Sequence, residues 1–357
     1  MGVIMKNSYI KSMTVVLLIG ILVFSLAGCG NNQSGQDGNQ EVLPEEINFG
    51  ILRIPNDETI AIAKGYFDKY FADRGIEVNT TVFDSGAEAN QALASGSIDF
   101  ATMGNTNAIT ALSRELKVEM VWLHEVLGDN EALAVKNGSG IEKIEDLKGL
   151  RVAVPFASTA HYILLNVLKE AGIEDDVQLL DMQTAEIVAA WERGDIKAAY
   201  SWQPTLAKLL DNGRALITSE DMAEKGYITA NVEVVRKEFS NKYPHLVADF
   251  ISAMAEAGDI YRENPQEAAE IVSGELGIEA EVALHQMRGT SWKTREELLS
   301  EDFFGTVENP GNFAKVMKDT SDFLQNQGSI EVSPSQETFN EYVNPEYIKM
   351  SLDNEQE

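Results

Sequence analysis

The hydrophobic positions after residue 46 follow two alternating periods, one typical of strands and one typical of helices. The apolar run 47–54 predicts a buried strand, and the next segment, 57–75, has apolar positions at helical spacing and ends at Gly75. This alternation of strand and helix continues to residue 137. Repeated βαβ units predict an α/β protein with a parallel sheet and right-handed crossovers.

The same patterns predict the remaining elements. Strands are expected at 76–84, 98–104, 118–126, 131–137, 151–156, 177–182, 198–202, 214–219 and 231–239. Helices are expected at 85–97 with Ser85 as the N-cap, and at 105–116, 161–171, 184–193, 205–212, 244–263, 265–275, 279–288 and 312–327. After residue 240 the pattern is therefore almost entirely helical.

The order of these elements predicts two α/β lobes joined by two crossovers. We expect lobe 1 to comprise residues 45–129 and 233–350, and lobe 2 to comprise 130–232. The crossovers, near Asn130 and Asn231, are expected to act as hinges. The helical C-terminal part is expected to lie on lobe 1. In open α/β sheets ligands bind beyond the carboxyl ends of strands, so two such edges face one cleft.

The N-terminus carries a different pattern. Two lysines precede an apolar run, and Leu-Ala-Gly follows that run before Cys29, which predicts a signal peptide over 1–28. The pattern resembles a bacterial lipobox, which implies lipidation of Cys29 and a membrane anchor. Residues 29–44 are polar and Gly-rich and predict a flexible tether. The alternative is an uncleaved N-terminal anchor. Cys29 is the only cysteine, so no intrachain disulfide forms.

The charge balance excludes one class of partner. The formal net charge is -29 at pH 7, with a sequence pI near 4.4. Nucleic-acid binding depends on basic side chains that neutralise phosphates, so no nucleic-acid partner is expected. The acidic surface is most simply a solvated face.

A strand-to-helix turn in lobe 2 is the first candidate site. Ser158, Thr159 and His161 follow an apolar strand and open a helix. Free backbone N–H groups at a helix N-terminus attract anions, and two hydroxyls and an imidazole add donors. The alternative is that a hydroxyl caps the helix and His161 packs in the core. In lobe 1, Asn105 and Thr106 occupy a turn of the same form, and the two turns together predict a clamp for a small anion.

Three more side chains are expected near this cleft. Trp202 lies at the end of a strand and is placed to wall the cleft, although an ordinary core position is equally compatible with the sequence. Glu131 and Asn231 lie beside the two crossovers and are placed to meet a polar or cationic ligand end. Their alternatives are solvent exposure or helix capping.

Motifs for catalysis are missing from the sequence. It contains no GxSxG elbow, Gly-rich phosphate loop, GxGxxG or HExxH. The four histidines are scattered, so neither a metal site nor a cofactor is expected. The sequence therefore favours a binding protein over an enzyme.

These stretches carry a family resemblance. The segments FDSGAEANQALASGSIDFATMG, DLKGLRVAVPFASTAHYILLNVLKEAGI and AAWERGDIKAAYSWQP make the chain resemble the taurine-binding lipoproteins of ABC importers, within the sulfonate/nitrate-type periplasmic-binding-protein group. The resemblance implies a type II two-lobe fold that closes on a hinge. It implies delivery of taurine or a related aminosulfonate to a permease and, through it, to an ATPase. It also implies that Ser158, Thr159 and His161 lie near the sulfonate, with Asn105 and Thr106 opposite.

One position departs from the family pattern. Where relatives read LDVWVVRK, with an acid suited to the taurine ammonium, this chain reads ANVEVVRK, and Asn231 takes the place of the acid. Glu131, Glu186 or Glu125 is expected to compensate. Taurine carries no net charge, so the acidic protein does not repel it at long range as it repels nitrate or sulfate.

We therefore expect an extracytoplasmic, lipid-anchored binding protein for taurine or a similar aminosulfonate, without catalytic activity. The alternatives are a binder of another sulfonate or small amine-bearing solute, a thiamine-precursor-type or hydrolytic enzyme with the same fold, and a structural surface protein.

Overall fold

The computed structural model describes residues 43–354. The signal peptide predicted over 1–28, Cys29 and the tether up to residue 42 lie outside the described residues. Within residues 43–354, no helix combines the length and apolar character that a membrane crossing requires.

Lobe 1 is built on a six-stranded sheet with the order β11-β4-β10-β3-β1-β2. Its strands are β1 (Glu46–Leu52), β2 (Glu77–Phe83), β3 (Phe100–Gly104), β4 (Val118–Leu127), β10 (Ala230–Arg236) and β11 (Thr290–Ser291). β1 pairs in parallel with β2 and β3, whereas β10 is antiparallel to β3 and β4. The parallel pairing predicted from the βαβ units is therefore confirmed for β1, β2 and β3, and β10 runs against it. The chain leaves lobe 1 at the carboxyl end of β4 and returns at the same end of the sheet. β10 therefore runs in the direction opposite to β4.

Lobe 2 is built on a five-stranded sheet with the order β7-β6-β8-β5-β9. Its strands are β5 (Glu131–Lys136), β6 (Arg151–Val154), β7 (Gln178–Asp181), β8 (Ala198–Trp202) and β9 (Gly213–Thr218). β6 is parallel to β7 and β8, and β5 is antiparallel to β8 and β9. In both sheets the strand that enters from the other lobe is antiparallel to its neighbours, and in lobe 1 the short β11 is also antiparallel to β4.

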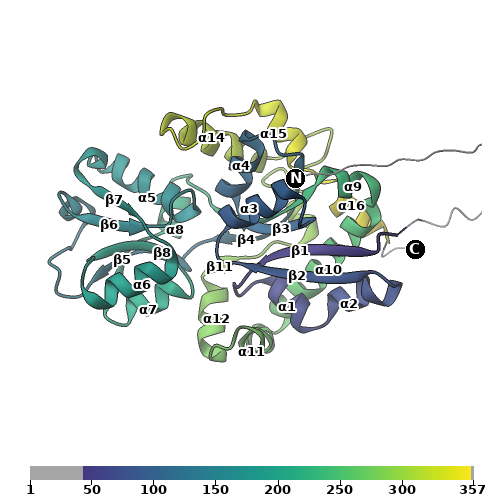
Figure 1. The fold of residues 1–357 in the computed structure, drawn as a ribbon, viewed down its shortest axis with the longest axis horizontal. Helices are drawn as coiled ribbons and strands as arrows, with labels where there is room; N and C mark the ends of the chain where they lie inside the picture. The colour runs from purple at the N-terminus through teal and green to yellow at the C-terminus, as the bar shows by residue number, and fades with distance from the viewer. Residues whose placement is uncertain (1–42, 355–357) are drawn as a thin grey trace, which may run out of the picture. The chain divides into compact units, whose positions relative to one another are not determined.

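The helices cover the faces of both sheets (Figure 1). They are α1 (Asp57–Ala63), α2 (Tyr66–Tyr70), α3 (Gly86–Ser95), α4 (Asn105–Ser113), α5 (Thr159–Glu170), α6 (Thr184–Arg193), α7 (Thr205–Leu210), α8 (Ser219–Ala223), α9 (Lys237–Lys242), α10 (Pro244–Glu263), α11 (Pro265–Leu276), α12 (Ala280–Arg288), α13 (Arg295–Leu298), α14 (Asn312–Asn326), α15 (Gln336–Tyr342) and α16 (Glu346–Asn354). The single helix expected over 57–75 is broken, because Gly65 has a φ of 70° and separates α1 from α2.

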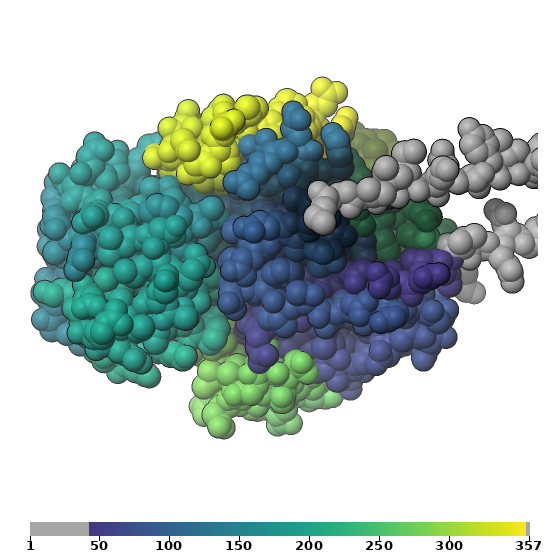
Figure 2. Space-filling model, viewed as in Figure 1, coloured from purple at the N-terminus to yellow at the C-terminus, as the bar shows by residue number. Residues whose placement is uncertain are grey.

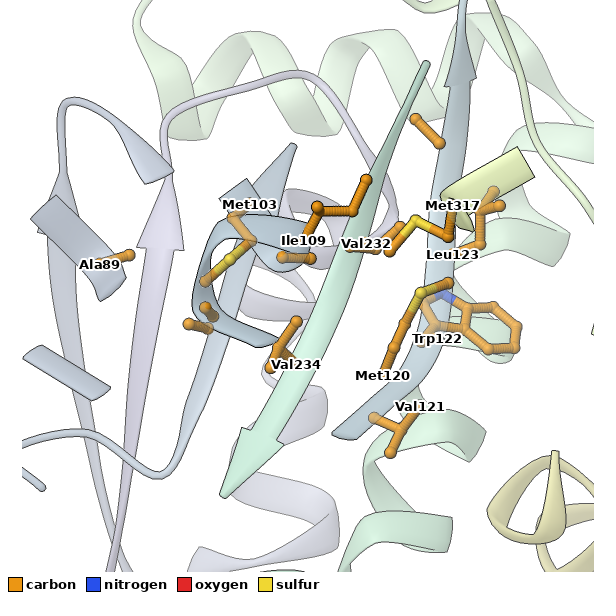
Figure 3. Packing of buried hydrophobic residues seen from close by; sticks show 14 of the residues in the cluster. Ala89, Met103, Ile109, Met120, Val121, Trp122, Leu123, Val232, Val234 and Met317 are labelled. Atoms are coloured by element: carbon orange, nitrogen blue, oxygen red, sulfur yellow. The ribbon is translucent and has the colours of Figure 1, made fainter. Parts of the chain in front are cut away.

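The core of lobe 1 extends from the sheet into the C-terminal helices. Val232 of β10 lies between Ile109 of α4 and Leu123 of β4, and all three are fully buried (Figure 3). On the other face, Phe49 of β1 stacks on Phe250 of α10 with ring centroids 5.8 Å apart. The helical C-terminal part therefore lies on lobe 1, as the sequence predicts.

The buried carboxyl of Glu119 binds the C-terminal segment to lobe 1. Glu119 of β4 accepts hydrogen bonds from the hydroxyls of Ser240 and Tyr347, and from Asn344 Nδ2 at 2.9 Å. These bonds hold α9 and the start of α16 against β4, in the sheet that carries one wall of the cleft. The two sheets form two lobes, which are joined by crossovers from β4 to β5 and from α8 to β10.

Candidate functional site

A cavity of about 270 Å³ lies between the two lobes. Five of the predicted site residues line it: Glu131, Ser158, Thr159, Trp202 and Asn231. Figure 2 shows the lobe with the five-stranded sheet, in teal, packed against the blue segment that contains α3 and α4. The cavity volume lies just below the ~300–1,000 Å³ typical of drug-sized ligands, so a small solute fits.

Helix N-termini surround the cavity. Residues at the starts of α3, α4, α5 and α6 all line it, and each of these helices follows a strand. The first N–H groups of a helix have no carbonyl partner inside the helix, and the aligned peptide dipoles add positive potential there. Their convergence provides an anion seat that needs no lysine, and no lysine is among the described residues that line the cavity.

Ser158 is the N-cap of α5. Its Oγ accepts from His161 N at 3.2 Å and donates to Pro155 O at 2.6 Å. The hydroxyl hydrogen is therefore already donated within the turn. What Ser158 contributes to the cavity is the direction of the helix start, and the backbone N–H groups of Thr159 and Ala160 come directly after it.

Thr159 and Glu131 form a buried pair at the same wall. Thr159 Oγ1 donates to Glu131 Oε1 at 2.5 Å, and Ser219 Oγ donates to Glu131 Oε2 at 2.6 Å. Burial raises the pKa of Glu131 to about 7, and the two hydroxyls oppose that shift. Glu131 thus holds the first residue of α5 in place from β5.

A second buried carboxyl lines the cavity from lobe 1. Glu125 of β4 is opposite Asn231 of β10, and Asn231 Nδ2 donates to Glu125 Oε1 at 2.6 Å. Burial raises the pKa of Glu125 to about 7, while the neighbouring His124 charge and the Asn231 hydrogen bond oppose the shift. The two carboxyls give the cavity an acidic side that a cationic group can use.

A buried polar network lies behind Glu125. His124 Nδ1 is 2.6 Å from Asp57 Oδ1, and its Nε2 is 3.1 Å from Glu233 Oε2. Burial lowers the pKa of His124, but the carboxylates of Asp57 and Glu233 outweigh it and the net pKa is raised. The positive charge behind Glu125 is therefore already paired. No cluster of potential metal ligands occurs among residues 43–354.

Three predicted residues do not line the cavity. His161 stacks on Phe156 with ring centroids 4.4 Å apart, and burial lowers its pKa to about 4, so the ring is neutral at pH 7. Asn105 Oδ1 accepts from Ala230 N at 3.4 Å, and Thr106 is buried beneath the start of α4. Consecutive residues of a helix point in different directions, so only part of each turn faces the cleft.

The structure adds residues that the sequence analysis did not single out. Asn107 Nδ2 of lobe 1 donates to Ala157 O of lobe 2 at 2.8 Å, and Gln286 Nε2 lies 3.3 Å from Gln203 Oε1. Both contacts join the lobes across the cavity. Ala157 has a φ of 58°, which is uncommon for a residue with a Cβ. Asn107 could have been found from the sequence, because it is a polar residue in the first turn of α4. Gln203 and Gln286 have no such sequence signal.

Comparisons with known proteins identify the family of the chain. A family model described as NMT1/THI5 like matches residues 59–268. The chain belongs to the NMT1/THI5-like family. This family member is 34% identical over 313 residues to the taurine-binding periplasmic protein of Escherichia coli K12, which covers 85% of this chain and 94% of that protein.

Two solved structures share the fold of this family member. The periplasmic aliphatic sulphonate binding protein SsuA from Escherichia coli has a TM-score of 0.70 at 20% identity, covering 86% of this chain and all of that one. The alkanesulfonate-binding protein SsuA from Xanthomonas axonopodis pv. citri, bound to MOPS, has a TM-score of 0.69 at 19% identity, covering 83% and 96%. All three relatives are named as binding proteins.

Proposed function

We propose that this protein is the substrate-binding component of an ABC importer and that it binds taurine or a similar aminosulfonate between its two lobes. The observation that carries the proposal is one small cavity with helix N-termini on its walls and buried carboxyls facing the same space. A zwitterionic aminosulfonate has an anionic sulfonate for the helix N-termini and a cationic amine for the carboxyls. The 34% identity to a taurine-binding protein supports the same ligand class.

The sulfonate end is assigned to the start of α5, with α4 opposite. Backbone N–H groups are fixed donors, and hydrogen bonds to a charged group are worth about 1.5–3 kcal/mol each. Arg53 also lines the cavity, so one cation is within the lining. The sulfonate has three oxygens, which suits several N–H donors arriving from different helices.

The apolar part of the ligand is assigned to the space beside Trp202. This side chain lies at the end of β8, opposite Glu131 in the strand register, and is partly exposed to the cavity. A two-carbon chain needs little apolar surface, and the cavity of about 270 Å³ disfavours long alkanesulfonates.

The enzyme alternative is tested by turnover. Among the described residues, no cysteine or histidine lines the cavity, so this lining holds neither a Cys–His nor a Ser–His pair for hydrolysis. When the protein is incubated with taurine, we expect all of the taurine to be recovered unchanged. Consumption of taurine at a rate proportional to protein concentration would establish an enzyme instead.

The anchoring part of the proposal rests on the lipobox-like sequence before Cys29. A lipid on Cys29 holds the protein at the extracytoplasmic face of the membrane, close to the permease that it supplies. Cys29→Ala is expected to release the protein from the membrane fraction or to leave it unprocessed. A variant with unchanged mature mass and unchanged membrane association contradicts this part alone.

Calorimetric titration tests the ligand class. The panel is taurine, ethanesulfonate, β-alanine, sulfate and nitrate, in phosphate buffer because sulfonate buffers such as MOPS compete for the site. We expect taurine to bind most tightly, since it alone joins a sulfonate to an amine. Tighter binding of sulfate or nitrate than of taurine contradicts the proposal.

A further inference from the structure

One carboxylate oxygen in the cavity wall has no hydrogen bond of normal geometry. Glu125 Oε1 accepts from Asn231 Nδ2, whereas Glu125 Oε2 is buried without such a bond among the described residues. The amide of Asn56, whose Nδ2 also has none, lies near enough to lower the pKa of Glu125. The side chain is only 3% exposed and belongs to the cavity lining. A buried polar atom without a partner destabilises the fold, so such an atom at a binding site indicates where a ligand donor goes.

We propose that Glu125 is the specificity-determining residue for the amine end of the ligand, and that its Oε2 accepts a hydrogen bond from the ligand ammonium. This inference rests on the proposed function and assigns one of its contacts. Glu125 then discriminates an aminosulfonate from a plain sulfonate of the same length.

The other acids near the cavity are less suited to this role. Both carboxylate oxygens of Glu131 already accept from hydroxyls of Thr159 and Ser219. Glu186 is exposed on α6, where its Oε2 accepts from the backbone of its own first turn at 2.9 Å, and it does not line the cavity. Asp84 lines the cavity but is exposed, and water screens an exposed charge.

Glu125 places an acid beside Asn231, where the sequence departs from the expected family pattern. Relatives are expected to carry an acid at the position of Asn231, on β10. Here the acid lies on the adjacent strand, directly opposite in register, at a point where the ladder is irregular between Asn231 and Val232. The amide of Asn231 donates to the displaced carboxylate and orients it, so the negative charge stays in the same corner of the cavity.

This assignment couples binding to protons. Burial raises the pKa of Glu125 to about 7, Asp57 adds to the shift, and His124, Asn231 and Asn56 oppose it. Arg53 and Glu131 line the same cavity. A carboxyl with this pKa is partly protonated in the free protein at pH 7. An ammonium binds the ionised form, so taurine is expected to release about half a proton at pH 7.

The test compares two ligands on three forms of the full chain. Taurine and ethanesulfonate are titrated calorimetrically into the unaltered protein, Glu125→Gln and Glu131→Gln, with melting temperatures measured in parallel. We expect Glu125→Gln to weaken taurine binding about 10- to 150-fold relative to ethanesulfonate. Glu131→Gln is the matched control, because it acts through Thr159 and is expected to change the affinity of both ligands by a similar factor.

A second measurement needs no substitution. Titrations of the unaltered protein at pH 7 in phosphate and in imidazole, which differ in ionisation enthalpy, report the protons exchanged. Taurine is expected to release protons and ethanesulfonate to release none. Glu131 has the same raised pKa, so the measurement is repeated on Glu131→Gln. Proton release by taurine that persists in Glu131→Gln assigns the proton to Glu125 even if Glu125→Gln does not fold.

Several outcomes overturn the inference. The first is that the unaltered protein binds taurine but Glu125→Gln weakens taurine and ethanesulfonate by the same factor. The second is that only Glu131→Gln loses affinity for taurine selectively. The third is that the two ligands release the same number of protons. If the unaltered protein binds neither ligand, the proposed function fails, and the inference fails with it.

Discussion

Gly104 of lobe 1 lies close to Thr159 of lobe 2, and it permits a test of lobe closure. A Cβ at this position would lie 2.8 Å from Thr159 Cγ2 of the other lobe. Its backbone φ of -64° suits any residue, so alanine strains nothing within lobe 1. Gly104→Ala is therefore expected to oppose the closed arrangement while leaving an open one unaffected.

The size of the effect follows from the clash. Overpacking by one methyl group costs about 1–3 kcal/mol, which corresponds to a loss of affinity of about 5- to 150-fold. Thr159 cannot easily rotate away, because its Oγ1 is bonded to the buried Glu131. The cost is expected in the dissociation constant for taurine and not in the melting temperature of the ligand-free protein.

Gly213→Ala is the matched control. Its Cβ would lie 2.7 Å from Leu209 O and 2.8 Å from Trp191 Cζ2, both within lobe 2 and outside the cavity lining. This variant is expected to melt lower with or without ligand. Calorimetry and thermal unfolding of both variants separate the two effects. Gly104→Ala with parental affinity, or with the same loss of ligand-free stability as Gly213→Ala, refutes the reasoning.

Three further predictions concern the cavity walls. Burial raises the pKa of Glu131 to about 7, so the folded state holds its proton more tightly than the unfolded state, and stability falls as pH rises from about 4.5 to 7. Glu131→Gln is expected to reduce that fall, by about 3 kcal/mol between pH 4.5 and 8 in denaturant unfolding, whereas the exposed Glu192→Gln leaves it unchanged; an unaltered slope in Glu131→Gln contradicts the account. Ser158→Ala removes the cap of α5 and is expected to cost about 1 kcal/mol of stability, with taurine affinity changed less than threefold; a tenfold loss of affinity instead gives its hydroxyl to the ligand. Burial lowers the pKa of His161 to about 4, so its contribution to stability is lost as pH falls from 6.5 to 4, and its ring signals in NMR spectra are expected to stay constant between pH 6 and 8; a midpoint near 6.5 contradicts its burial.

Much of the fold could be predicted from local sequence signals. Ser85 and the turn before α5 predicted helix starts, and α10 spans the predicted range 244–263, beginning at a proline. The direction of β5 and β10 could not be predicted, because it depends on which edge of a sheet the chain enters after crossing between lobes. Local patterns do not record that long-range choice.

The candidate site could be predicted only in part. Polar residues at strand ends correctly predicted which end of each sheet carries the site, and Glu131, Thr159 and Trp202 line the cavity. Glu125 was named only as one of several compensating acids, since its facing toward the cavity depends on an irregular register between β4 and β10. A sequence pattern of period two does not reveal such an irregularity.

The most direct test of the central claim is a crystal structure with taurine, in which anomalous scattering from the ligand sulfur shows its orientation. The account predicts a sulfur peak in the cavity beside the backbone N–H groups at the start of α5, with the amine within hydrogen-bond distance of Glu125. A sulfur peak beside Glu125, or no taurine in the cavity at saturating concentration, contradicts it.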